Sequence, residues 1–416
     1  MKRYYSSVIL VLLIIVSIGT YYFYRSTDRL PEFKLVAVKG DQKEADGIEL
    51  SGNYGARMRS EIVNVTTEGS EYSSRQSMYE QEIKNARSWF YQHSDMRKLV
   101  KEHRDFMRGK TDPDSFYMDK EWIIYAAVSQ SPANIEKPET EIRVQVLNVK
   151  TGREDQFATI ISEQTPYHNA QVVDVQRYDN ELQILTSAMS GTEFSTKFRK
   201  YVLDLSNGHL IRNEELPYKF IDREGVRYSH NVISHEVSSA PGNYVLLAVR
   251  EEKVTVDRNQ SYSSQPIADH FFAYSYKTGK LIEIPESWTA ASLNSHQQYN
   301  LNGNRLSVLT YGSANISVSG YDLDTLQEAY KRTSYTAAQL GAVSIGSAYM
   351  SGNRVIILLH QNDKPMMAVN DKPMIAVIDA TKGALLYQGE VVVDGPASEA
   401  EEHMKHLRLY NLTPRI

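Results

Sequence analysis

Residues 375–389 read IAVIDATKGALLYQG, and this stretch indicates the fold. Apolar residues run up to Asp379, a polar turn ends at Gly383, and a second apolar run follows. A short apolar run bounded by turn residues predicts a strand, and the short polar turn predicts that the chain doubles back. The stretch therefore predicts two antiparallel strands.

The same hairpin shape occurs four more times. The other copies are VQVLNVKTGRE (144–154), KYVLDLSNGHLI (200–211), FAYSYKTGKLIEI (272–284) and VSGYDLDTLQEAY (318–330). A further strand precedes each of the five copies, at 120–128, 180–188, 242–250, 303–311 and 352–360. Still earlier strands, such as QVVDVQ (171–176) and NVISHEV (231–237), make the unit a meander of four strands.

Four-stranded antiparallel units at this spacing predict an all-β chain folded as a β-propeller. Strands at 33–40, 46–52 and 60–72 supply a first blade, so we expect about six blades, with the others spanning 114–395. A pair of β-sandwiches or an extended stack of sheets are the alternatives. The hairpin pattern resembles that of quinoprotein-type and WD-type repeats between Asp119 and Val393. This resemblance implies an architecture and no activity.

Residues 73–110 interrupt the strands. Ser73 to Arg108 contain no Gly or Pro, and their apolar residues fall at the spacing of three and four that is typical of an amphipathic helix. We expect a helical insertion, divided near Ser94, whose apolar stripe packs on the strands. Residues 396–416 predict a short helix followed by a strand at 406–412 that completes the first blade.

The N-terminus predicts a membrane anchor. Residues 4–24 are uncharged and flanked by tyrosines, and Lys2 and Arg3 precede them. We expect residues 1–7 to be a cytoplasmic tip, 8–24 a transmembrane signal-anchor, 25–32 a linker and the remainder extracytoplasmic. Ser17 and Gly19 have the spacing of a signal-peptidase site, so a cleaved signal peptide is the alternative.

Composition narrows the classes of function. The chain has no cysteine, which excludes disulfides, thiol nucleophiles and iron–sulfur clusters. Lys and Arg total 46 against 51 Asp and Glu, without a basic stripe, so nucleic acid is not an expected partner.

Individual ionisable residues give no catalytic or metal signature. Acids and histidines can supply catalytic bases or metal ligands, so they are the candidates for such a site. They comprise the possible helical face of Glu399, Glu402, His403 and His406; His230 and His235; the pair Asp269 and His270; and the acids Asp174, Asp204, Asp322 and Asp379. The recurrence of Asp204, Asp322 and Asp379 at one repeat position predicts that they form turns. We therefore predict no catalytic residue, metal or cofactor.

Three functions follow from this sequence. The first is a membrane-anchored binding, scaffold or sensing module of a bacterial cell envelope, with an envelope or membrane protein as its partner. The second is an envelope hydrolase or lyase whose site lies in the propeller channel, and the third is a binder of a small ligand in that channel. We expect the first and regard an enzyme as less favoured, because no catalytic motif is present.

Overall fold

The computed structural model describes residues 10–20, 30–56, 59–75, 94–130, 139–162, 167–190, 196–218, 223, 225–233, 239–256, 262–289, 296–362 and 372–414. The chain divides into two compact units. The first comprises Met1–Asn85, Tyr311–Ser317 and Thr333–Ile416, and the second comprises Ala86–Thr310 and Val318–Arg332.

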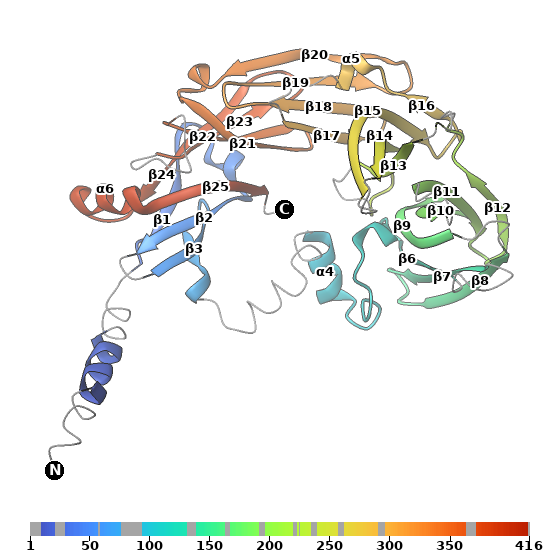
Figure 1. Ribbon diagram of the computed structural model, residues 1–416, viewed down its shortest axis with the longest axis horizontal. Helices are drawn as coiled ribbons and strands as arrows, with labels where there is room; N and C mark the ends of the chain where they lie inside the picture. Colours follow the sequence, from blue (N-terminus) through green and yellow to red (C-terminus); the bar gives the residue numbers. More distant parts are fainter. Residues whose placement is uncertain are drawn as a thin grey trace. The chain divides into compact units, whose positions relative to one another are not determined.

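In the described part of the chain the strands form six sheets, which fit a β-propeller of generic type with six blades (Figure 1). Blade 1 has the order β25 (Leu407–Pro414), β2 (Ile48–Ala56), β3 (Arg59–Val65) and β4 (Ser70–Tyr72). Blade 2 contains β5 (Phe116–Met118), β6 (Trp122–Gln130), β7 (Glu139–Asn148) and β8 (Glu154–Ser162). Blade 3 contains β9 (Tyr167–Tyr178), β10 (Glu181–Ser190), β11 (Thr196–Asp204) and β12 (Leu210–Glu215).

The remaining blades repeat this meander. Blade 4 contains β13 (Val226–Val232), β14 (Tyr244–Val256), β15 (Tyr262–Ser275) and β16 (Leu281–Glu283). Blade 5 contains β17 (His296–Asn302), β18 (Arg305–Tyr311), β19 (Asn315–Asp322) and β20 (Gln327–Thr336). Blade 6 contains β21 (Ser344–Ser351), β22 (Arg354–His360), β23 (Met374–Asp379) and β24 (Leu385–Val393).

The two ends of the chain join different blades within the first unit. β25 pairs with β2, which puts the predicted closing strand in blade 1 (Figure 1). β1 (Phe33–Gly40) was expected in blade 1, but it pairs with β24 and makes blade 6 a sheet of five strands. This corrects the prediction. Buried residues from both blades, including Leu35, Leu50 and Leu358, share one apolar cluster.

Apolar clusters also join neighbouring blades within the second unit. Ile142 and Ile184 belong to the cluster of blades 2 and 3, Leu185 and Leu247 to that of blades 3 and 4, and Leu246 and Leu306 to that of blades 4 and 5. The sheets of blades 3 and 4 are therefore covered on both faces, and burial of this apolar surface is the main stabilising contribution.

The helical insertion is shorter than predicted in its described part. Ser73–Arg75 form a single 3₁₀ turn (η3), and α4 runs from Ser94 to Glu102 and not to Arg108. Met96, Leu99, Phe106 and Met107 are buried against Phe116, Ile123 and Leu147, so the apolar stripe packs on blade 2 as expected. Residues 76–93 lie outside the described residues.

The other helices are short. They are η2 (Gln42–Ala45), η4 (Pro113–Ser115), α5 (Glu286–Thr289), η5 (Ala338–Leu340) and α6 (Ala397–His406). Residues 10–20 are also helical, whereas residues 1–9 and 21–29 lie outside the described residues. Among the described residues no helix has both the length and the apolar character needed to cross a bilayer, so the predicted transmembrane helix at 8–24 is not found.

Candidate ligand-binding groove

A groove of about 610 Å³ lies between blades 2 and 3, within the second unit. Its walls come from the starts of β6 and β8, the ends of β7 and β9, and the turns that follow β7, β9 and β11. These segments meet because the β5–β6, β7–β8, β9–β10 and β11–β12 turns all lie at the same end of their antiparallel strands. The groove is therefore built by residues far apart in sequence.

The floor of the groove is apolar. Trp122, Phe157 and Leu205 are half-buried and pack on the core shared by blades 2 and 3, beside the buried Ile124 and Val146. Trp122 is held at the first position of β6, where its backbone amide donates to Oδ1 of Asp119 at 2.7 Å. Side chains of this kind pack on a core while leaving apolar surface open to a ligand.

The rim carries neutral polar side chains that also shape the turns. Oδ1 of Asn148 accepts from the amides of Lys150 (3.1 Å) and Thr151 (2.9 Å). Oδ1 of Asn207 accepts from the amide of His209 at 2.8 Å, and Nδ2 of Asn180 donates to Asp204 at 2.7 Å. Each of these asparagine side chains is thus held in place through either its oxygen or its nitrogen atom.

Two arginines in the groove are paired with carboxylates. The guanidinium of Arg153 lies 3.0 Å from Asp155, and Nη1 of Arg177 lies 3.6 Å from Oδ2 of Asp119. Arg177 also stacks over the indole of Trp122, at 5.3 Å from the ring centroid. Partial burial acts to raise the pKa of Asp119, but hydrogen bonds from the amides of Glu121 and Trp122 outweigh it and lower that pKa.

The helical acids and histidines at the C-terminus have surface and structural partners. Glu402 pairs with His406 at 3.4 Å, and Nδ1 of His403 lies 2.7 Å from the hydroxyl of Tyr54 on β2. Glu399 lies in the first turn of α6. Across the described residues no group of three or more His, Asp or Glu side chains is arranged to hold a metal ion.

His230 has a structural position in the contact between blades 3 and 4. His230 is buried on β13 and packs edge-on against the rings of Phe198 and Tyr218. Burial, assisted by the charge of Lys197, lowers the pKa of His230 to about 4. His235 lies outside the described residues. A neutral, enclosed imidazole of this kind serves packing.

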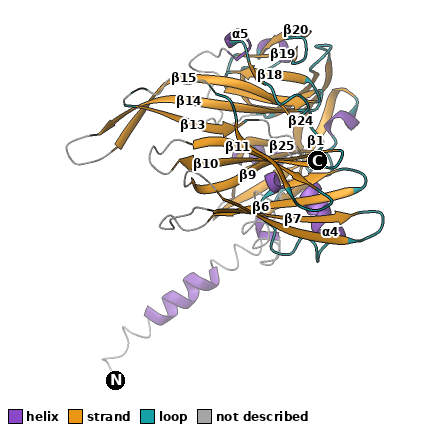
Figure 2. Cartoon of the chain, turned by 90° about the vertical axis from the view of Figure 1, so that its right-hand side faces the viewer, coloured by secondary structure: helices purple, strands orange, loops and turns teal. Residues whose placement is uncertain are grey.

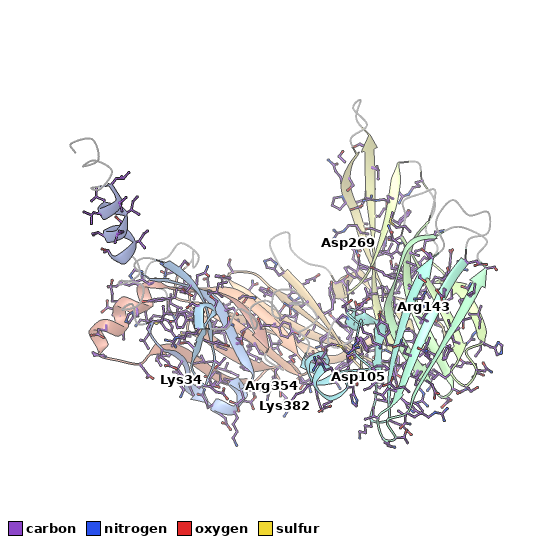
Figure 3. All side chains as sticks on the ribbon, turned by 90° about the horizontal axis from the view of Figure 1, so that it is seen from below. Lys34, Asp105, Arg143, Asp269, Arg354 and Lys382 are labelled. Atoms are coloured by element: carbon purple, nitrogen blue, oxygen red, sulfur yellow. The ribbon has the colours of Figure 1, made fainter. Side chains whose placement is uncertain are left out.

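Asp269 and His270 do not pair with each other. Asp269 accepts from Arg250 on β14 at 2.7 Å, and His270 faces Glu251 at 3.7 Å. Adjacent residues of a strand point to opposite faces, which separates the two side chains. They lie on the β14–β15 hairpin, which extends past its neighbouring strands in Figure 2 and carries the labelled Asp269 in Figure 3.

Three of the weighed acids form turns, as predicted. Asp379 accepts from the amides of Thr381 (2.9 Å) and Lys382 (3.0 Å), and Asp322 accepts from those of Asp324 (3.0 Å) and Thr325 (2.8 Å). Asp204 accepts from the amide of Ser206 at 2.8 Å. Each carboxylate therefore holds the tight turn between the third and fourth strands of its blade.

Asp174 differs from these acids because it is buried in the middle of β9. Its Oδ1 accepts from Gln176 at 3.0 Å and its Oδ2 from the phenol of Tyr276 at 2.6 Å. Burial raises the pKa of Asp174 to about 6 against the opposing effect of these hydrogen bonds. The carboxyl group is enclosed in the contact between blades 3 and 4 and takes no part in the groove.

Sequence reasoning did not identify the groove. Its floor residues occupy ordinary repeat positions, and the available signal was the aromatic side chain of Trp122 at a place where the other copies carry Leu or Val. An aromatic residue at this position indicates a site only once the packing of blade 2 against blade 3 is known.

The comparisons with known proteins add no assignment to the fold described above. No protein-family model matches the chain, and no curated protein matches it. Similar solved structures include a variant of the Synechocystis apocarotenoid oxygenase (TM-score 0.32, 8% identity, 65% of this chain and 58% of that chain). They also include the Dos1 propeller (TM-score 0.25, 12% identity, 61% of this chain and 55% of that chain). A third is the periplasmic gluconolactonase of Pseudomonas aeruginosa (TM-score 0.29, 9% identity, 81% of this chain and 93% of that chain). The chain thus spans 58% of the length of the oxygenase. In the described residues the strands form five sheets of four strands and one of five, and these sheets define the class as a generic β-propeller.

Proposed function

We propose that this chain is a membrane-tethered, extracytoplasmic β-propeller that acts as a binding module of the cell envelope. The groove between blades 2 and 3 is the observation that carries the proposal. Its volume of about 610 Å³ falls in the range of small-molecule sites, and an apolar floor with a few polar groups is the usual composition of such sites.

The chemistry of the groove favours binding over catalysis. Its two arginines are engaged by Asp155 and Asp119, and its amides are oriented by turns. Asp174 and His230, which are candidate bases by residue type, are buried among structural partners in the contact between blades 3 and 4. Rigid blades that hold a preformed groove reduce the entropy lost when a ligand binds.

Support for the tether comes from the sequence. The uncharged run from Tyr4 to Tyr24, preceded by Lys2 and Arg3, has the length and flanks of a signal-anchor. We expect the full chain to stay in the membrane fraction during a carbonate wash. Release of a chain that begins at Thr20 would contradict the anchor and support a cleaved signal peptide.

Crosslinking tests the binding role. A photoreactive amino acid at Asn207 places the probe on the rim of the groove, and the same amino acid at Gln327, an exposed residue on β20, serves as a control. Irradiation of intact cells should give an adduct from position 207 that position 327 does not give. Identical products from both positions would contradict a specific site in the groove. A protein adduct would identify the envelope partner that we propose for this module.

A further inference from the structure

We propose that the groove between blades 2 and 3 takes a neutral, polyhydroxylated ligand of the saccharide class. This inference rests on the proposed function and adds the chemical class of the ligand. Three properties of the groove support it: the floor, the hydrogen-bonding groups of the rim, and the balance of charge.

The floor suits the apolar face of a sugar ring. Trp122, Phe157 and Leu205 are half-buried and lie over the core, so each keeps part of its carbon surface exposed to the groove. The guanidinium of Arg177 lies over the indole of Trp122, at 5.3 Å from the ring centroid, and shares this surface. The C–H groups of a pyranose ring gain dispersion contacts on such a surface, and water is released from both. A fully polar ligand without an apolar face would leave this floor uncovered.

The rim offers both donors and acceptors. Asn148 and Asn207 use their Oδ1 atoms in turns, which leaves their Nδ2 groups as donors, whereas Asn180 uses Nδ2 and keeps Oδ1 as an acceptor. Within the described residues no further hydrogen bond engages these three atoms. A hydroxyl group donates one hydrogen bond and accepts two, so a mixed rim matches a ligand that carries several hydroxyls.

The charges of the groove disfavour an anionic ligand. Arg153 is held by two contacts to Asp155, at 3.0 and 3.1 Å, and Arg177 is paired with Asp119 at 3.6 Å. A phosphate or carboxylate would have to compete with these carboxylates, and sites for anions present free donors and excess positive charge instead. The two arginine charges of the groove are therefore balanced by adjacent carboxylates, Asp155 in its lining and Asp119 beside it.

Binding to the full chain in detergent micelles tests this assignment. The probes are neutral oligosaccharides (maltotriose, cellotriose and N-acetylglucosamine trimers), with a galacturonic acid trimer and ATP as anionic counterparts, measured by titration calorimetry. We expect at least one neutral oligosaccharide to bind, and Trp122→Ala to weaken it about tenfold or more, as truncation of a central aromatic contact does. The anionic probes should bind at least about tenfold more weakly.

Gln156→Ala provides a second variant in case Trp122→Ala does not fold. Gln156 is exposed on β8 and lines the groove, and Gln327 is an exposed residue on β20, the fourth strand of blade 5. Gln156→Ala should reduce binding of the neutral oligosaccharide, whereas the matched control Gln327→Ala should leave it unchanged. Equal effects of the two substitutions would overturn the assignment.

The remaining outcomes separate the two proposals. If an anionic probe binds in a manner that depends on Trp122 or Gln156, and no neutral oligosaccharide does, the saccharide assignment is wrong and the groove is still a binding site. If no neutral oligosaccharide binds the folded chain, the saccharide assignment is also overturned. If, in addition, the probe at Asn207 gives the same products as the probe at Gln327, the proposed binding function fails as well.

Discussion

The phenol of Tyr276 donates a hydrogen bond to the carboxyl group of Asp174, with Oη 2.6 Å from Oδ2, in the buried contact between blades 3 and 4. The same contact holds Lys200, whose Nζ lies 2.7 Å from Glu214 and bonds to the hydroxyl of Tyr274. The rings of Tyr274 and Tyr276 meet edge to face at 5.4 Å. Blades otherwise joined by apolar packing are therefore also joined by a polar network, which specifies how the two sheets fit.

The first prediction concerns the pH dependence of stability at Asp174. Its pKa of about 6 in the folded chain exceeds the ordinary value of 3.8. Between about pH 4 and 6 the folded chain retains a proton that the unfolded chain has lost, so the free energy of unfolding falls as the pH rises through this window. Asp174→Asn cannot ionise. The stability of the wild type relative to this variant should fall by on the order of 2 to 3 kcal/mol between pH 4 and 7.

Thermal unfolding of both chains at several pH values measures this difference. The wild-type curve alone is a poor measure, because His230, with a pKa of about 4, acts with the opposite sign over an overlapping range. Asp204→Asn is the control. Hydrogen bonds from Ser206 lower the pKa of Asp204, so its contribution is lost as the pH falls. If the stability of the wild type relative to each variant changed with pH in the same direction, burial would not be the cause of the raised pKa of Asp174.

The repeat itself was predictable from sequence because its signals are local. Alternation and the turn residues of the hairpins, such as Asp379 and Gly383, specify strands and turns within about ten residues of one another. The role of Asp174 was not predictable in the same way. Alternation assigns polar residues to a solvent face, whereas β9 is covered on both faces and buries Val173, Asp174 and Val175 in succession.

Pairings between distant segments carry no periodic signal either. β1 and β24 are separated by most of the chain, and the strand pattern of residues 33–40 fits an edge of blade 1 as well as it fits an edge of blade 6. The groove is a further case, since Trp122 and Asn207 become neighbours only after blades 2 and 3 have packed. Local sequence patterns thus predict the individual blades, whereas the contacts between blades can be identified only in the structure.

The second prediction concerns the turn carboxylates. Asp379→Ala removes acceptors for the amides of Thr381 and Lys382 and for the Thr381 hydroxyl, at 2.7 to 3.0 Å. Loss of a side chain that caps backbone amides should cost about 1 to 2 kcal/mol in urea unfolding. Asn148→Asp is the control, because Asn148 holds the equivalent turn through an oxygen that a carboxylate retains. It should change stability by less than about 0.5 kcal/mol.

The third prediction concerns the pairing of β25 with β2. A Cβ atom at Gly52 would lie 1.9 Å from the carbonyl oxygen of Arg408, whereas one at Gly55 would lie 3.8 Å from its nearest neighbour. Gly52→Ala must therefore displace β25, and we expect it to lower the free energy of unfolding by more than about 2 kcal/mol. Gly55→Ala should be within about 1 kcal/mol of the wild type. If the two substitutions lowered the free energy of unfolding in urea by similar amounts, the close approach of β25 to β2 would not be what stabilises blade 1.

The last prediction concerns a tandem duplication, NDKPMMAV at 362–369 followed by NDKPMIAV at 370–377. The second copy leads into β23, whose Val377 pairs with Ile356 of β22, whereas residues 363–371 lie outside the described residues. Deletion of 362–369 would bring the second copy directly after Gln361 and leave the sequence of β22 and β23 intact. Because the free energy of closing a loop varies only weakly with its length, the deletion should shift the melting temperature by less than about 5 °C. A larger decrease in the melting temperature would mean that the first copy is a paired strand of blade 6. The deletion would then change the register between β22 and β23.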